Sequence, residues 1–124
     1  MNKIVCSSID FVFLSEVNTM NEGEDPILNE NGIWKKIDVF EKPVYQSNVK
    51  QNDAGPTNEE TVSVEARRNN LTELLIKKCG FYTILRMRTD NEVFYVGNVN
   101  YPCKFEFTSD KVFDTYSFRA ISPA

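Results

Sequence analysis

The sequence contains no histidine. Histidine is the side chain most often used for proton transfer near neutral pH, and it is the commonest protein ligand of transition metals. Its absence excludes Ser-His and Cys-His catalytic pairs, together with every metal site that needs an imidazole ligand. We therefore expect a protein that is not an enzyme and that has no cofactor, no catalytic residue and no metal ligand.

Glycines and long apolar runs are scarce as well. The five glycines are isolated from one another, so neither of the glycine-rich loops that cradle phosphates is present. No run approaches the ~18 apolar residues of a membrane span, and Ser7, Ser8 and Asp10 interrupt the N-terminal apolar run before it can form a signal-peptide core. We expect no membrane partner, and no small-molecule substrate is evident.

The three cysteines, Cys6, Cys79 and Cys103, are far apart in the sequence and odd in number. They lack the CxxC spacing of zinc sites, and each lies in an apolar or alternating run. The pattern is typical of small buried apolar side chains in a reducing compartment, not of a disulfide framework.

What the sequence does contain is a globular composition with an uneven distribution of charge. Its 124 residues are 41% hydrophobic and 26% charged, which predicts a single domain over residues 1–124. Residues 1–62 carry five lysines against eleven acids, whereas all five arginines lie in residues 63–124. Oppositely charged halves suit head-to-tail stacking of identical subunits, and the simpler alternative is chance placement in loops.

Seven segments have the alternating or apolar pattern of β-strands. They span residues 3–14, 33–45, 60–66, 81–89, 92–99, 103–107 and 116–120. Asp90-Asn91 has the composition of a two-residue hairpin turn and joins two of these segments. Polar stretches at about 15–32 and 46–60 predict two long loops.

One helix is predicted at about 70–79. Asn70 and Glu73 match a capping box, apolar residues recur at helical spacing after them, and Gly80 ends the segment. The expected fold class is therefore α+β and mainly β, as an antiparallel β-sandwich or small barrel with one packed α-helix.

One predicted hairpin concentrates aromatic and basic residues on paired strands. Its first strand carries Phe81, Tyr82, Arg86 and Arg88, and its second carries Phe94 and Tyr95. This is the composition of a base-stacking platform with a basic rim. The alternative is a core of aromatic rings with arginines that reach solvent, and the net charge of −4 argues against nucleic acid as a partner. The predicted interaction residues are Arg67, Arg68, Arg86, Arg88, Trp34 and Tyr95.

The sequence is also rich in aromatic side chains, with nine Phe, five Tyr and one Trp. Most of them must fill the core, but a fold of seven strands leaves open edges that invite pairing with another subunit. We expect self-association through these edges and through the two long loops.

A discontinuous pattern between Ile84 and Phe118 resembles small virion proteins of tailed phages and prophages of gut bacteria. It consists of Ile84-Leu85, Asp90-Asn91-Glu92, Tyr95-Val96-Gly97-Asn98, Tyr101-Pro102-Cys103-Lys104-Phe105 and Thr115-Tyr116-Ser117-Phe118. The resemblance implies a multimeric, non-enzymatic tail or head–tail connection protein with other virion-like proteins as partners. It also implies a location in the cytoplasm of the bacterial host or in the virion.

Together these observations predict a non-enzymatic structural subunit of a phage-like assembly, acting through loop and edge-strand contacts. The alternative is a monomeric binding module that uses the basic and aromatic sheet face for nucleic acid or a partner peptide. A histidine-free hydrolase built on carboxylates is a third class, and it requires a cleft that contains a carboxyl of raised pKa.

Overall fold

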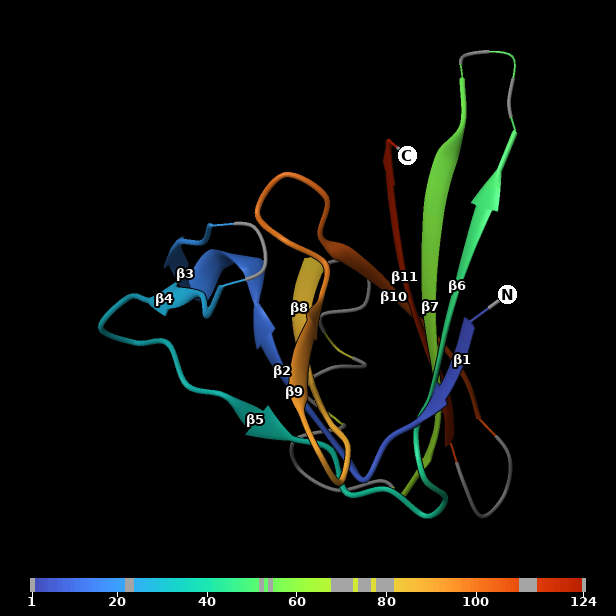
Figure 1. Cartoon of the computed structure of the whole chain (residues 1–124). Coiled ribbons are helices and arrows are strands. Elements are labelled where there is room, and N and C mark those ends of the chain that lie inside the picture. Colours follow the sequence, from blue (N-terminus) through green and yellow to red (C-terminus); the bar gives the residue numbers. More distant parts are fainter. Residues whose placement is uncertain are drawn as a thin grey trace.

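The computed structural model describes residues 2–21, 24–51, 53, 55–67, 73, 77, 82–109 and 114–123, and these residues form a mainly β, antiparallel fold. This confirms the predicted fold class in its β part (Figure 1). The strands are β1 (Asn2–Val5), β2 (Ser8–Phe13), β3 (Val17–Thr19), β4 (Ile27–Leu28), β5 (Lys35–Lys36), β6 (Val44–Lys50), β7 (Thr57–Ala66), β8 (Tyr82–Arg88), β9 (Val93–Val96), β10 (Cys103–Ser109) and β11 (Asp114–Pro123). A single 3-10 turn, η1 (Leu14–Glu16), follows β2.

The main sheet is bent around one core. Its strand order is β1-β6-β7-β11-β10-β8-β2-β5, with β9 also paired to β8. Although β1 and β2 are consecutive in the chain, β1 pairs with β6 and β2 pairs with β8. Two backbone bonds fix the bend between them, from Cys6 N to Pro43 O at 2.8 Å and from Ser7 N to Arg88 O at 2.7 Å. The two layers meet at this corner and diverge away from it (Figure 1).

The core is filled by every second residue of the long strands, because side chains alternate between the two faces of a strand. The buried cluster includes Ile9, Phe11, Phe13, Val62, Val64, Ala66, Leu85, Met87, Phe105, Tyr116 and Phe118. Phe105 is central to it, with ring centroids 5.3 Å from Tyr116 and 5.1 Å from Phe118. Most of the aromatic load thus belongs to the core, as expected for such a small domain.

Two of the predicted strands have different bounds in the structure. The segment 3–14 is divided into β1 and β2 by the corner at Cys6 and Ser7. The segment 33–45 is not one strand, since only Lys35–Lys36 and the residues from Val44 onward are extended and paired, with an isolated bridge at Val39. Its apolar residues belong to a chain that crosses from one layer to the other, which sequence periodicity cannot distinguish from a strand.

The prediction of a long loop at about 46–60 is wrong. Residues 44–50 and 57–66 form a long antiparallel hairpin in which Lys50 pairs with Thr57 and Val44 with Ser63. The outer part of this hairpin extends beyond the core, so both of its faces are polar. A strand that is polar on both faces lacks the alternation that identifies strands in a sequence.

The predicted loop at 15–32 contains more structure than expected. It begins with η1 and holds the two-stranded sheet of β3 and β4, which is separate from the main sheet. Of the predicted helix at 70–79, only Glu73 and Lys77 fall within the described residues, and both are helical. The other residues of that range lie outside the described part of the chain, so a helix packed on the sheet is not shown.

Gly97 and Cys103 lie against each other at the junction between β9 and β10. Gly97 has a φ of +83°, and a Cβ atom at this position would lie 3.0 Å from the Cys103 sulfur. Cys103 and Cys6 are free thiols and fully buried. They are the small buried side chains expected from the sequence, and Cys79 lies outside the described residues.

We predict that Gly97→Ala lowers the free energy of unfolding by about 2–4 kcal/mol, because it adds a steric contact to backbone strain. Gly55→Ala is the matched control: Gly55 also has a positive φ, of +112°, but nothing lies within 4 Å of the added Cβ. It should cost only the strain, about 1–2 kcal/mol. Chemical denaturation measures both, and equal losses would contradict the proposed packing against Cys103.

Candidate functional site

Four of the six predicted interaction residues meet on the outer face of the sheet formed by β5, β2, β8 and β9. Arg86 on β8 lies opposite Tyr95 on β9, and on its other side it lies opposite Asp10 on β2. Trp34, just before β5, packs beside Arg86 and Tyr95. Its ring centroid lies 6.0 Å from that of Tyr95 and 4.5 Å from the Arg86 guanidinium carbon. The sequence therefore identified residues that are neighbours in space.

The charge of this cluster is balanced within the chain. The Arg86 Nε and NH2 atoms lie 3.1 and 3.0 Å from Asp10 Oδ2, and Arg88 Nε lies 3.8 Å from the same oxygen. The Asp10 side chain is only 9% exposed and that of Arg86 is 22% exposed. Asp10 was missed by the sequence analysis, because only the pairing of β2 with β8 places it beside Arg86.

Tyr95 joins this cluster to the segment that carries β3 and β4. Its hydroxyl donates a hydrogen bond to the carboxylate of Asp25. Burial raises the Tyr95 pKa to about 12, and the hydrogen bond and the charge of Asp25 act in the same direction, while Arg86 and Arg88 oppose them. The phenol is therefore a protonated donor over the physiological pH range.

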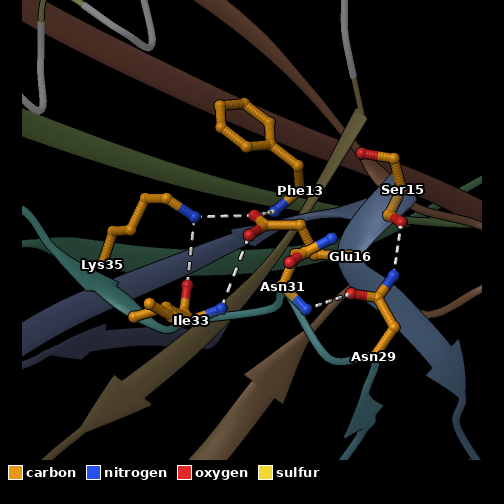
Figure 2. A network of polar contacts seen from close by, with 7 residues as sticks. All are labelled: Phe13, Ser15, Glu16, Asn29, Asn31, Ile33 and Lys35. Atoms are coloured by element: carbon orange, nitrogen blue, oxygen red, sulfur yellow. Dashed lines mark hydrogen bonds and ion pairs between the residues drawn. The ribbon is translucent and has the colours of Figure 1, made fainter.

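A second network fastens the same segment at its base (Figure 2). Glu16 Oε1 accepts hydrogen bonds from Lys35 Nζ at 2.6 Å and from the Phe13 amide at 3.1 Å, and Oε2 accepts one from the Ile33 amide at 3.4 Å. Asn29 Nδ2 donates to Ser15 O at 2.9 Å. We call residues 17–21 and 24–34 the acidic arm, and these contacts fasten its two ends to η1 and β5.

The remaining two predicted residues do not join the cluster. Arg67 stacks on Phe40, with the guanidinium carbon 5.6 Å from the ring centroid, and its amide donates to Asp38 O at 3.1 Å. It is part of a separate contact at the end of β7. Arg68 lies outside the described residues.

The contacts of the cluster form a clamp that ties Trp34 to β8 and Asp25 to β9. Among the residues that the structure describes, no group of three or more Cys, Asp or Glu side chains could hold a metal ion. Burial raises the pKa of the Cys6 and Cys103 thiols, which keeps them in the weakly nucleophilic protonated form. Within the same described ranges, no helix is long and apolar enough to cross a membrane.

A second surface is open to solvent on the outer face of β8, β10 and β11. We call it the basic groove, a hollow of about 640 Å³. Its lining includes Tyr82, Val99, Tyr101, Ile121, the cations Lys104 and Arg119, and the acid Glu106. The four uncharged residues of this set are among the large apolar or aromatic side chains that the fold leaves exposed.

A third feature is a three-stranded ribbon that extends past the core, formed by residues 48–50, 57–59 and 121–123. The hairpin of β6 and β7 rises above the rest of the fold, with the end of β11 beside β7 (Figure 1). β1 reaches only Ser47 of β6, and β10 reaches only Arg119 of β11. In the described part of the chain, both outer edges of the ribbon therefore have no strand partner.

No family model, curated protein or solved structure matches this chain.

We predict that Arg86→Gln lowers the free energy of unfolding by about 1–3 kcal/mol, because it leaves a nearly buried carboxylate without its close partner. Arg88→Gln is the control. Its side chain is 49% exposed and lies farther from Asp10, so its loss should stay within about 0.5 kcal/mol. Similar losses in urea denaturation of the two variants would show that Arg86 has no special role in the clamp.

We also predict that stability declines as the pH rises from 10 towards 12. The folded chain holds the Tyr95 proton more tightly than the unfolded chain, whose phenol has the ordinary pKa of 10.0. That contribution is complete below pH 10.0 and is lost through the folded-state pKa of about 12. The absorbance change of tyrosinate, compared between the wild type and Tyr95→Phe, reports this group. Asp25→Asn should move its midpoint towards 10, and an unchanged midpoint would remove Asp25 as a cause.

Proposed function

We propose that this chain is a non-enzymatic structural subunit that assembles by adding strands to the open edges of its ribbon. Its assignment to a phage-like tail or head–tail connection is part of this proposal and derives from the resemblance of the residues between Ile84 and Phe118. The observation that carries the proposal is the ribbon itself. Its strands stay paired beyond the core, although packing on a core is what normally stabilises paired strands.

The edges of the ribbon have the properties of association surfaces. Unpaired strand edges expose backbone N–H and C=O groups that pair readily with another chain, and monomeric proteins usually cover or charge such edges. Val49 on β6 is 65% exposed and Ile121 on β11 is 49% exposed. Apolar side chains on uncovered edges favour association in solution.

The internal contacts of the Arg86 cluster also favour this function over nucleic-acid binding. A platform for bases needs free aromatic faces and cations that can reach phosphates. Here the Trp34 face is covered by Arg86, and Arg86 is paired with Asp10. A monomeric module that binds a partner peptide is the second candidate, and the basic groove is the observation that favours it.

The proposal predicts that shortening the ribbon abolishes self-association without unfolding the core. Replacing residues 49–58 by Asn-Gly would join Asn48 to Glu59, which are already paired across the hairpin. Asn-Gly is a favourable two-residue turn, so the inner parts of β6 and β7 should keep their register. Light scattering after size exclusion, over a wide range of protein concentration, would show oligomers for the wild type and monomers for the shortened chain.

A matched control changes the other hairpin. Asp90→Gly with Asn91→Gly alters the turn between β8 and β9, which is exposed and lies beside the corner at Cys6 and Ser7, and should leave the oligomer unchanged. A wild-type chain that remains monomeric at every concentration would overturn the assembly proposal and favour the peptide-binding module.

A further inference from the structure

A hollow of about 370 Å³ lies along the edge of β9, where this strand faces β7 (Figure 1). Its lining includes Met20 and Asp25 of the acidic arm, Glu60 of β7, and Val93, Phe94 and Tyr95 of β9. Consecutive side chains of a strand point to opposite faces, so a hollow that touches all three residues of β9 must run along the edge of that strand. In the described part of the chain β9 pairs only with β8, and this edge has no strand partner.

The hydrogen bonds of β8 determine which backbone groups of β9 face the free edge. The Arg88 carbonyl accepts a bond of 2.7 Å from the side of β2, and the Thr89 amide donates one of 2.9 Å to the side of β9. Backbone groups alternate in direction along a strand, so the odd-numbered residues of β8 bond to the even-numbered residues of β9. Val93 and Tyr95 therefore direct their N–H and C=O groups to the free edge, where they can pair with an added strand.

Glu60 places a carboxylate without a cation on the inner wall of the hollow. The preceding residue, Glu59, lies on the outer face, 2.9 Å from Lys50 Nζ and 3.5 Å from Arg119 Nε. Because side chains alternate, Glu60 lies on the same face as the buried residues of β7. Among the described residues it accepts a hydrogen bond of 2.6 Å from the Tyr45 hydroxyl and forms no ion pair. The phenol is uncharged, so this partly buried carboxylate lacks an opposite charge.

The charge of the hollow is negative. Asp25 forms its outer rim, where it accepts the hydrogen bond from Tyr95, and Glu60 lies on the inner wall. The described residues of the lining include no lysine or arginine. The two arginines of β8 lie beside Tyr95, but their ion-pair partner is Asp10. A cation supplied from outside the chain would therefore be attracted to Glu60.

The walls beside the carboxylate suit a cation carried on a long apolar stem. Met20 and Phe94 contribute to them, and the Phe94 ring is packed edge-on against Tyr45 with centroids 5.1 Å apart. Lysine and arginine bury their methylene groups along apolar surface while the charged end reaches a polar group. An aromatic face adds a further attraction for the cation.

We propose that the free edge of β9 binds an extended segment of a partner protein, and that a lysine or arginine of this segment enters the hollow and pairs with Glu60. Backbone bonds to Val93 and Tyr95 would supply affinity, and the hollow would select the cation. The chain itself has a net charge of −4, which favours a basic partner over a second copy at this site. The site is distinct from the ribbon edges, so the inference goes beyond the assembly function.

The test measures peptide binding to the full-length chain by isothermal titration calorimetry. The probe is acetyl-Thr-Val-Lys-Val-Thr-amide, whose β-branched residues favour an extended conformation. A second peptide has norleucine in place of the lysine, which keeps the apolar stem and removes the charge. We expect saturable binding of the lysine peptide and binding weaker by roughly tenfold or more for the norleucine peptide.

Glu60→Gln should weaken binding of the lysine peptide by roughly tenfold, because the amide oxygen can still accept the Tyr45 hydrogen bond but carries no charge. Glu59→Gln is the matched control, since it removes the same charge one residue away on the opposite face. It should bind the peptide as the wild type does. Equal weakening by the two variants would show a general effect of net charge and would contradict the site.

Val93→Pro tests the backbone contact. It removes an N–H group that faces the free edge and no bond to β8, and edge strands tolerate proline at such positions. This variant should fold and lose most of the peptide binding, whereas Val93→Ala should keep it. If circular dichroism shows that the proline variant does not fold, two N-methylated lysine peptides replace it. One is methylated at both valines and the other at the lysine, and only one of them should lose binding, because alternate N–H groups of an added strand face β9.

Each remaining outcome decides against a stated part of the inference. The site is wrong if the wild type shows no saturable binding at about 1 mM lysine peptide, or if the norleucine peptide binds equally well. N-acetyl-lysine amide that binds as tightly as the pentapeptide would indicate a site for small cations and exclude strand addition. A wild-type oligomer that dissociates on Val93→Pro would identify a second copy, in place of a partner protein, at this edge. The peptide titration is informative for a monomer and for an oligomer, so failure of the assembly function and failure of this site are separate results.

Discussion

The bend between β1 and β2 is the constraint on which the rest of the structure depends. It allows two consecutive strands to pair with opposite parts of the sheet, and thereby turns one long antiparallel sheet around a single buried cluster. Its two short backbone bonds come from Cys6 and Ser7, and Cys6 is fully buried at the turn. Without this bend the apolar faces of β2 and β7 would lie in one open sheet and remain exposed to water.

The size of the core that this bend encloses determines which parts of the strands are left over. β7 and β11 are ten residues long, and the buried alternation in β7 begins only at Val62. The excess length becomes the ribbon, whose strands are paired with one another beyond the buried cluster. A protein that maintains such a ribbon exposes backbone edges to solvent, and the proposed assembly gives these edges a partner.

The Arg86 cluster illustrates how a functional pattern and a structural one can share the same residues. Arginine and aromatic residues alternate on neighbouring strands both in platforms that bind nucleic acid and in clamps that fix a segment to a sheet. The difference is made by Asp10, which is 76 residues away in the sequence and supplies the neutralising carboxylate. Cations with a nearby acid serve stability, and Arg119 beside Glu59 is a further example, whereas Lys104 has no ion pair among the described residues.

The sequence alone determined that the chain is mainly β, that Cys6 and Cys103 are small buried side chains, and that the turn at Asp90-Asn91 joins two neighbouring strands, because period-two alternation and turn composition are local properties. It also predicted Trp34, Arg86, Arg88 and Tyr95 as interaction residues. Only the tertiary structure decided that residues 44–50 and 57–66 pair as a hairpin, that Asp10 neutralises Arg86, and that the basic groove lies on β10 and β11. These features depend on strand order and register, which bring together residues that no local pattern connects.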